Sequence, residues 1–150
     1  MADVNRALDL ESHDGDGHDI DRAWAEVMQR CADLLPFFVE TRLDLSATRV
    51  AIQMGVRRAQ GLERMLRTRR LPPFRSLRNW IYIVQLVQRH ESGESVAHWA
   101  MQQGEYPTPY YRMVTKESGL LWSDVVGRGS AWCKAEGLRR WRPYLVPSAS

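Results

Sequence analysis

The 150-residue sequence has no long apolar run and only two cysteines. Its longest uncharged apolar run, residues 79–88, is about half of the ~20 residues that a membrane-spanning helix needs, so we expect no membrane partner. Cys31 and Cys133 lie far apart and outside any Cys-x-x-Cys spacing, which favours a reduced, cytoplasmic protein over a disulfide-bonded or zinc-binding domain. The first residues are acidic and polar, without the apolar core of a signal peptide.

The signatures of enzymes and of metal sites are also missing. The sequence contains no nucleophile elbow, no phosphate-binding glycine loop and no histidine pair at metal-binding spacing. His90 and His98 fall on different expected helices, and the segment HDGDGHD lacks the spaced carboxylates and closing glutamate of an EF-hand. We therefore predict a protein that is not an enzyme and that binds neither a cofactor nor a metal ion.

The net charge of +3 is unevenly distributed along the chain. Residues 1–26 carry eight acids and two arginines, a net charge of −6, whereas residues 27–150 carry nineteen bases and ten acids, a net charge of +9. We expect residues 1–18 to be a disordered acidic tail. Arginine greatly outnumbers lysine, and its planar guanidinium suits contacts to phosphate and guanine. The alternative is an arginine-rich solvated surface that reflects only a GC-rich genome.

One pattern occurs twice, at an offset of 49 residues. Each copy has a serine, an alanine five residues later and a glycine four residues after that. A serine suits a helix N-cap, a small alanine allows a second helix to cross closely, and a glycine can adopt positive φ in a turn. The two copies are Ser46, Ala51 and Gly55, and Ser95, Ala100 and Gly104. The pattern predicts two copies of one short helix–turn–helix unit rather than a solenoid.

In each copy, apolar residues seven and ten positions after the glycine are expected to face the first helix of the unit. They are Leu62 and Met65 in the first copy, and Tyr111 and Val114 in the second.

Helical periodicity predicts further elements around the two units, which cover about residues 43–70 and 94–126. An amphipathic helix over 19–38 precedes the first unit, and a strongly apolar helix over 76–90 connects the two. We predict an all-α, homeodomain-like fold, in which two helix-turn-helix subdomains over residues 19–130 are joined by this long connector. Residues 131–150 are expected to be a basic, partly aromatic C-terminal tail, and the sequence leaves open whether this tail packs back on the fold or contacts phosphates.

With these features the sequence resembles the DNA-binding domain of the AraC/XylS family of bacterial transcription regulators, over roughly residues 43–126. That family has two helix-turn-helix units joined by one long helix. Its second unit carries an alanine, a glycine, an aromatic residue on the recognition helix, basic residues and a further glycine. The matching residues here are Ala100, Gly104, Tyr111, Arg112, Lys116 and Gly119. In the first unit they are Ala51, Gly55, Leu62, Arg64 and Leu66.

The sequence departs from the family pattern in three places. Glu105 stands where an aromatic usually follows the glycine, Thr115 stands where a phenylalanine is usual, and the spacing to Gly119 is one residue short. About 40 residues precede the first unit, too few for the sensor domain that most members carry. Effector binding is therefore not part of what the resemblance implies.

The sequence thus predicts a sequence-specific regulator that reads double-stranded DNA in two successive major grooves, with RNA polymerase or another regulator as a further partner. The expected contacts of the first unit are Arg57, Arg58, Gln60, Arg64 and Arg67. Those of the second are Thr108, Tyr110, Arg112, Met113 and Lys116. Arg64 and Arg112 are the expected guanine readers, because a bidentate arginine–guanine pair is the commonest specific contact. The alternative is an all-helical module that binds another regulator or polymerase, in which the arginines form a solvated face.

Overall fold

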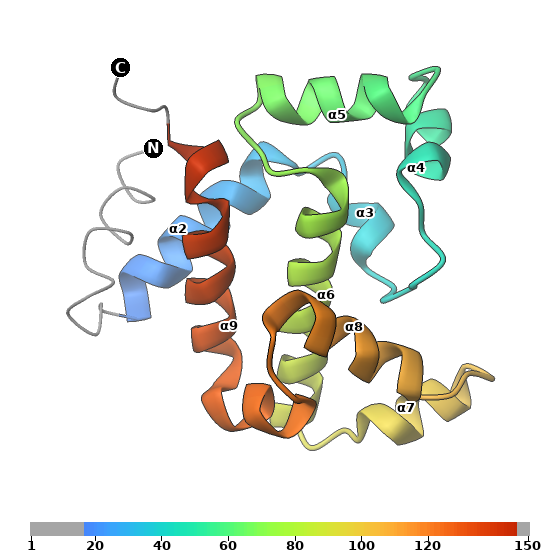
Figure 1. Cartoon of the computed structure of the whole chain (residues 1–150), viewed down its shortest axis with the longest axis vertical. Helices are drawn as coiled ribbons and strands as arrows, with labels where there is room; N and C mark the ends of the chain where they lie inside the picture. The colour runs from blue at the N-terminus through green and yellow to red at the C-terminus, as the bar shows by residue number, and fades with distance from the viewer. Residues whose placement is uncertain (1–16, 147–150) are drawn as a thin grey trace.

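Two pairs of short helices adjoin one long central helix. The computed structural model describes residues 17–146, and that part of the chain is helical and contains no strand. The central helix is α6 (Phe74–Glu91), and the expected connector over 76–90 is thereby confirmed as a helix. Before it come α4 (Ala47–Gln53) and α5 (Ala59–Thr68), and after it α7 (Val96–Gln102) and α8 (Thr108–Ser118). In Figure 1 the first pair lies near the start of α6, and the second pair lies further along it.

The predicted helix over residues 19–38 is divided in the structure. Helix α2 (Gly17–Arg30) is followed by a turn and then by the short helix α3 (Leu35–Phe38). Pro36 accounts for the break, because a proline inside a helix loses a hydrogen bond and clashes with the preceding turn, whereas it suits the first turn of a new helix. The predicted acidic tail lies outside the described residues, except for its last two residues, which belong to α2.

The last helix, α9 (Trp122–Leu145), corrects the prediction of a C-terminal tail. Its course is interrupted at Gly129, where φ is 88° and ψ is 169°, and the N–H of Ser130 then donates to Glu91 Oε2 at 3.2 Å. Glu91, at the end of α6, thereby caps the second half of α9. This half packs against α2 and α6 (Figure 1), and its residues Cys133, Leu138, Trp141 and Leu145 belong to the core.

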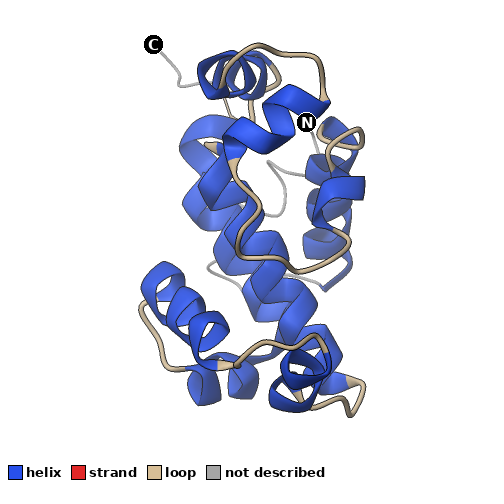
Figure 2. Ribbon diagram, turned by 90° about the vertical axis from the view of Figure 1, so that its right-hand side faces the viewer, coloured by secondary structure: helices blue, strands red, loops and turns tan. Residues whose placement is uncertain are grey.

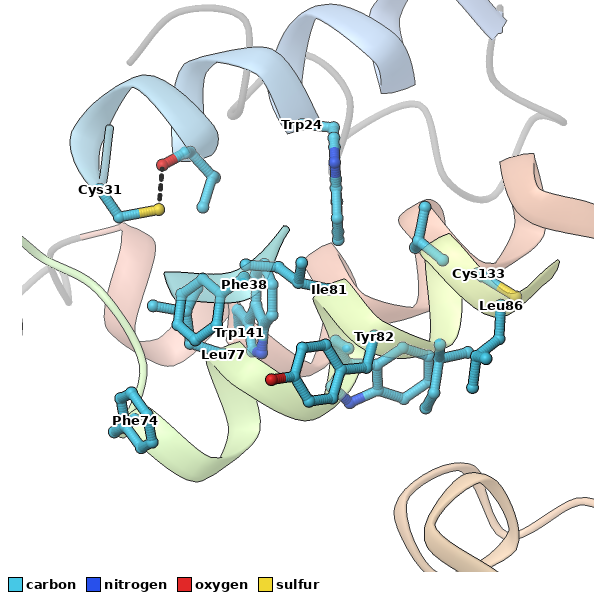
Figure 3. Close-up of a cluster of buried hydrophobic side chains, with 14 of the residues drawn as sticks. Trp24, Cys31, Phe38, Phe74, Leu77, Ile81, Tyr82, Leu86, Cys133 and Trp141 are labelled. Carbon is cyan, nitrogen blue, oxygen red and sulfur yellow. Dashed lines mark hydrogen bonds between the residues drawn. The ribbon is translucent and has the colours of Figure 1, made fainter. Parts of the chain in front are cut away.

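The core between α2, α6 and α9 is rich in aromatic rings (Figure 3). Trp24 of α2 stacks on Trp141 of α9, with ring centroids 5.4 Å apart and an interplanar angle of 17°. The rings of Trp24 and Trp80 pack close to α9 at Gly137, where an added Cβ would lie 3.4 Å from the Trp24 ring and 3.5 Å from the Trp80 ring. Cys31 and Cys133 are both buried in this core, and burial raises the pKa of each thiol to about 12.

The repeated pattern is present in the backbone of both short helices that begin a pair. Ser46 Oγ accepts a hydrogen bond from the N–H of Arg49 at 3.1 Å, and Ser95 Oγ accepts one from the N–H of His98 at 3.2 Å. The two serines are therefore equivalent N-caps, which confirms the prediction for both.

The turn that follows is also the same in the two copies. Gly55 has a φ of +76° and Gly104 a φ of +77°, in the left-handed region that favours glycine. In each copy the N–H of the residue after the glycine donates to the carbonyl of the buried alanine, Ala51 or Ala100, at 2.8 and 2.9 Å respectively. The offset of 49 residues therefore holds from the N-cap through the turn.

The repeat changes register within the second helix of each pair. The buried residues of α5 are Leu62 and Leu66, whereas α8 buries Tyr110 and Val114 among others. The first buried side chain thus comes seven residues after the glycine in the first copy and six residues after it in the second. In the second copy, one residue fewer separates the glycine of the turn from the first buried side chain of the next helix. The buried side chains of α5 and α8 are therefore equivalent at an offset of 48 residues instead of 49.

This shift corrects part of the predicted packing. Tyr110, not Tyr111, is the aromatic residue that contacts the first helix of its pair, because its ring meets Trp99 edge-on with centroids 5.2 Å apart. Tyr111 is only half-buried and lies against Trp122 at the start of α9, with centroids 5.7 Å apart. Met65 is half-buried as well, whereas Leu62 and Val114 are buried as predicted.

Candidate nucleic-acid interface

The outer face of α5 collects three of the predicted contacts. Gln60, Arg64 and Arg67 recur at helical spacing on the side opposite the buried Leu62 and Leu66, and all three are exposed. Arg57 and Arg58 are exposed in the turn that leads into this helix. The structure therefore gathers all five predicted residues of the first unit on one turn and one helix face.

The outer face of α8 collects three contacts of the second unit. Thr108, Arg112 and Lys116 are spaced by four residues, on the side opposite Tyr110 and Val114, and are exposed. In the shifted register, Arg112 stands two residues after its buried anchor Tyr110. Arg64 stands two residues after Leu62 in the same way, so the two arginines occupy equivalent places on their helices.

These cations differ from most other basic side chains because no carboxylate neutralises them. Arg42 and Arg49 pair with Asp44, Arg89 with Glu94, and Arg140 with Glu136. Within the described part of the chain, no acidic side chain forms a salt bridge with the cations of the two outer faces or of the turn before α5. These side chains are Arg57, Arg58, Arg64, Arg67, Arg112 and Lys116. Both faces therefore carry uncompensated positive charge.

Two predicted DNA contacts are wrong because their side chains face the interior. Tyr110 is only 1% exposed, and its hydroxyl donates to a carboxylate oxygen of Glu105. Burial and this hydrogen bond raise the pKa of the Tyr110 hydroxyl. Met113 is 9% exposed and belongs to the hydrophobic core. The one-residue register shift explains both errors, because it turns positions 110 and 113 inward.

Two charged residues in and after α5 make contacts within the protein and do not belong to the exposed outer face. Arg69 forms a two-pronged pair with Asp33, at 2.6 and 3.0 Å, and its hydrogen bonds lower the pKa of that carboxyl group. Glu63 accepts the N–H of Phe74 at 3.0 Å and so caps the start of α6. Because Glu63 is the acid that lies within the arginine-rich segment, this contact directs its negative charge away from the outer face of α5.

Tyr106 is an exposed side chain that the sequence analysis missed. Its side chain is 82% exposed in the turn before α8. At the 49-residue offset of the repeated turn, Tyr106 is the equivalent of Arg57 in the first copy. The sequence signal for Tyr106 is this offset, which extends from the two glycines into the turn residues. An exposed aromatic ring at the entrance to α8 suits contact with a thymine methyl group or a sugar.

Gly61 allows α5 to pack closely on the turn that precedes it. A Cβ added at this position would lie 2.4 Å from Cγ1 of Val56, so the valine side chain would have to move. Gly61→Ala is therefore expected to lower the free energy of unfolding by about 1 kcal/mol, although alanine is the better helix former.

Gly61→Ala should change the free energy of unfolding in the opposite direction when the side chain of Val56 is shortened. In a Val56→Ala background, Gly61→Ala is expected to raise the free energy of unfolding by up to about 1 kcal/mol. Urea unfolding of the four proteins measures both effects. A stabilising effect in the parent protein would contradict the close packing.

Comparison of the chain with models of protein families, with curated proteins and with solved structures finds no match. Among the described residues, no helix is both long and apolar enough to cross a membrane. The search of these residues also finds no group of histidine, cysteine and acidic side chains placed to hold a metal ion.

Proposed function

We propose that this protein is a sequence-specific DNA-binding transcription regulator of the AraC/XylS type. Each pair, α4–α5 and α7–α8, acts as a helix-turn-helix unit, and α5 and α8 are the recognition helices that enter two successive major grooves. The observation that carries the proposal is the equivalence of Arg64 and Arg112, two exposed and unneutralised arginines at the same place on two helices that follow the same turn.

The side chains of the two outer faces divide between base and phosphate contacts. Arg64 and Arg112 lie far enough along each helix to reach base edges, and each guanidinium can donate two parallel hydrogen bonds to O6 and N7 of a guanine. Gln60 and Thr108, near the helix N-termini, are the second pair of base contacts. Arg67 and Lys116, further along each helix, contact phosphates and hold the protein in register.

A second candidate function is a module that binds another protein, such as a regulator or polymerase. Ile52 and Met101 favour it, because they are 65% and 67% exposed and are equivalent at the 49-residue offset on α4 and α7. Large apolar side chains this exposed suit a protein interface. Binding through these residues is compatible with DNA binding through α5 and α8, since they lie on different helices.

Titration with DNA at increasing salt tests the proposal. The logarithm of the binding constant should fall linearly with the logarithm of the salt concentration, with a slope of about −0.9 for each phosphate contact. Arg67→Ala and Lys116→Ala should each reduce the magnitude of this slope by about 1. The Arg22→Ala variant, with an exposed arginine removed from α2, serves as control and should keep the parent slope. Absence of binding at low salt would favour the protein-interaction module.

A further inference from the structure

The loop between α3 and α4, residues 39–46, lies against the side of α6 (Figure 2) and is held there by hydrogen bonds. We call this loop the strap. Arg78 Nη1 donates to the carbonyls of Leu45 at 2.7 Å and Leu43 at 3.3 Å, and Tyr82 donates to the carbonyl of Arg42 at 2.9 Å. Arg78 and Tyr82 are one helical turn apart on α6, so one face of the connector satisfies the backbone of the strap. The strap leads directly into α4 and thereby ties the first unit to α6.

The same arginine extends a hydrogen-bonded chain toward the second unit. Its Nε and Nη2 atoms donate to Asn79 Oδ1 at 3.0 and 2.8 Å. Asn79 Nδ2 in turn donates to Glu117 Oε2, in the last turn of α8, at 3.2 Å. Asn79 is buried and Arg78 and Glu117 are half-buried, so these bonds are partly shielded from water, and burial lowers the pKa of the Arg78 guanidinium. A continuous chain of hydrogen bonds therefore runs from the backbone before α4, through α6, to α8.

The end of α8 is also held from α9. Arg140 donates to the carbonyl of Glu117 at 2.7 Å and to that of Ser118 at 3.0 Å, while its guanidinium lies 5.3 Å from the centre of the Trp80 ring. These bonds satisfy carbonyls that have no partner at a helix C-terminus. Glu117 thus receives a backbone contact from α9 and a side-chain contact from α6, and both hold the end of α8 against these two helices.

We propose that Asn79 and Glu117 are positioning residues that set the direction of α8 relative to α5. The inference rests on the proposed function, because it makes simultaneous reading of two grooves depend on the contact between Asn79 and Glu117. Asparagine suits the place for a chemical reason, since one amide can accept from the arginine and donate to the glutamate at the same time. An aspartate could accept but not donate, and its charge would repel Glu117.

Exchanging the donor and the acceptor between positions 79 and 117 distinguishes an effect on the direction of α8 from a general loss of stability. Asn79→Asp breaks the contact with Glu117, whereas Glu117→Gln keeps it, because the glutamine oxygen still accepts from Asn79. In the double variant the amide introduced at position 117 donates to the carboxylate introduced at position 79, so the bridge is restored with reversed polarity. We therefore expect Asn79→Asp to alter the position of α8 and to weaken binding to a two-groove duplex. Glu117→Gln and the double variant should resemble the parent protein in both measurements.

The first readout needs no DNA. Spin labels on cysteines introduced at the exposed Thr68 and Lys116 report the distance between the ends of α5 and α8, while the buried Cys31 and Cys133 stay unlabelled in the folded protein. A narrow distance distribution is expected for the parent and the double variant, and a broader or shifted one for Asn79→Asp. Equal distributions in all variants would overturn the inference, whether or not the protein binds DNA.

The second readout compares two duplexes taken from selected binding sites, one long enough for two grooves and one for a single groove. Asn79→Asp should bind the long duplex about tenfold more weakly, because the advantage of linking two contacts is lost, and the short duplex within about twofold of the parent. Equal weakening on both duplexes would indicate a general defect and overturn the positioning role. Should Asn79→Asp fail to fold, Asn79→Ala removes the bridge without adding charge, and the same comparisons decide the question.

Discussion

Replacing Arg64 or Arg112 with alanine is expected to remove the base preference at one position of the DNA site and to cost about 1–3 kcal/mol of binding free energy at that position. Each guanidinium is exposed, lacks an acidic partner among the described residues and stands two residues after the buried anchor of its helix. A bidentate arginine–guanine contact discriminates against the other bases, so its loss should equalise binding to all four.

The two substitutions should affect different positions of the same site. Because α5 and α8 are proposed to enter successive grooves, the affected positions should lie about 10 base pairs apart. Competition binding with single-base variants of a selected duplex measures the effects, with Arg22→Ala as the matched control. Loss of the same base preference in both variants, or uniform weakening on every sequence, would contradict the assignment.

Trp141→Ala is expected to lower the free energy of unfolding by about 3–5 kcal/mol, the largest stability effect that we anticipate. The Trp141 ring is fully buried, stacks on Trp24, and donates its indole N–H to Ser76 Oγ at 2.9 Å. Its removal would leave a large cavity between α2, α6 and α9 (Figure 3) and an unpaired hydroxyl.

Tyr144, an exposed aromatic residue on the same helix, provides the matched control. Tyr144→Ala should change the free energy of unfolding by no more than about 0.5 kcal/mol. Chemical unfolding monitored by circular dichroism compares the two variants with the parent. Equal, small effects of the two substitutions would contradict the packing of the second half of α9 in the core.

The repeated turn could be predicted because short-range chemistry determines it. A serine N-cap, a glycine at positive φ and a small alanine act within a few residues of one another, and Ser46, Gly55 and Ala51 do what their types favour. The connector was predictable for a similar reason, since a helix that is apolar on most sides must be buried.

The register of α8 could not be read in the same way. Tyr110 and Tyr111 are adjacent and equally aromatic, so periodicity alone does not decide which one faces Trp99. The ring contact and the burial of Tyr110 decide it, and with it the exclusion of Met113 from the outer face.

The C-terminal helix was missed because its buried stripe is unusual. Cys133, Gly137 and Trp141 follow one another at four-residue spacing, but a small thiol and a glycine give little hydrophobic signal among four arginines and a lysine. Long-range polar contacts were equally hidden. The bridge from Asn79 to Glu117 joins residues 38 positions apart, and only the packing of α8 on α6 brings them together.

The central claim is that two recognition helices read one DNA site together. Selection of bound duplexes from a random pool, repeated at two salt concentrations, tests it most directly. The account predicts enrichment of two short motifs centred about 10 base pairs apart, each with a guanine whose preference is lost in Arg64→Ala or Arg112→Ala. Recovery of unenriched sequences, or of a single short motif that neither substitution affects, would contradict it.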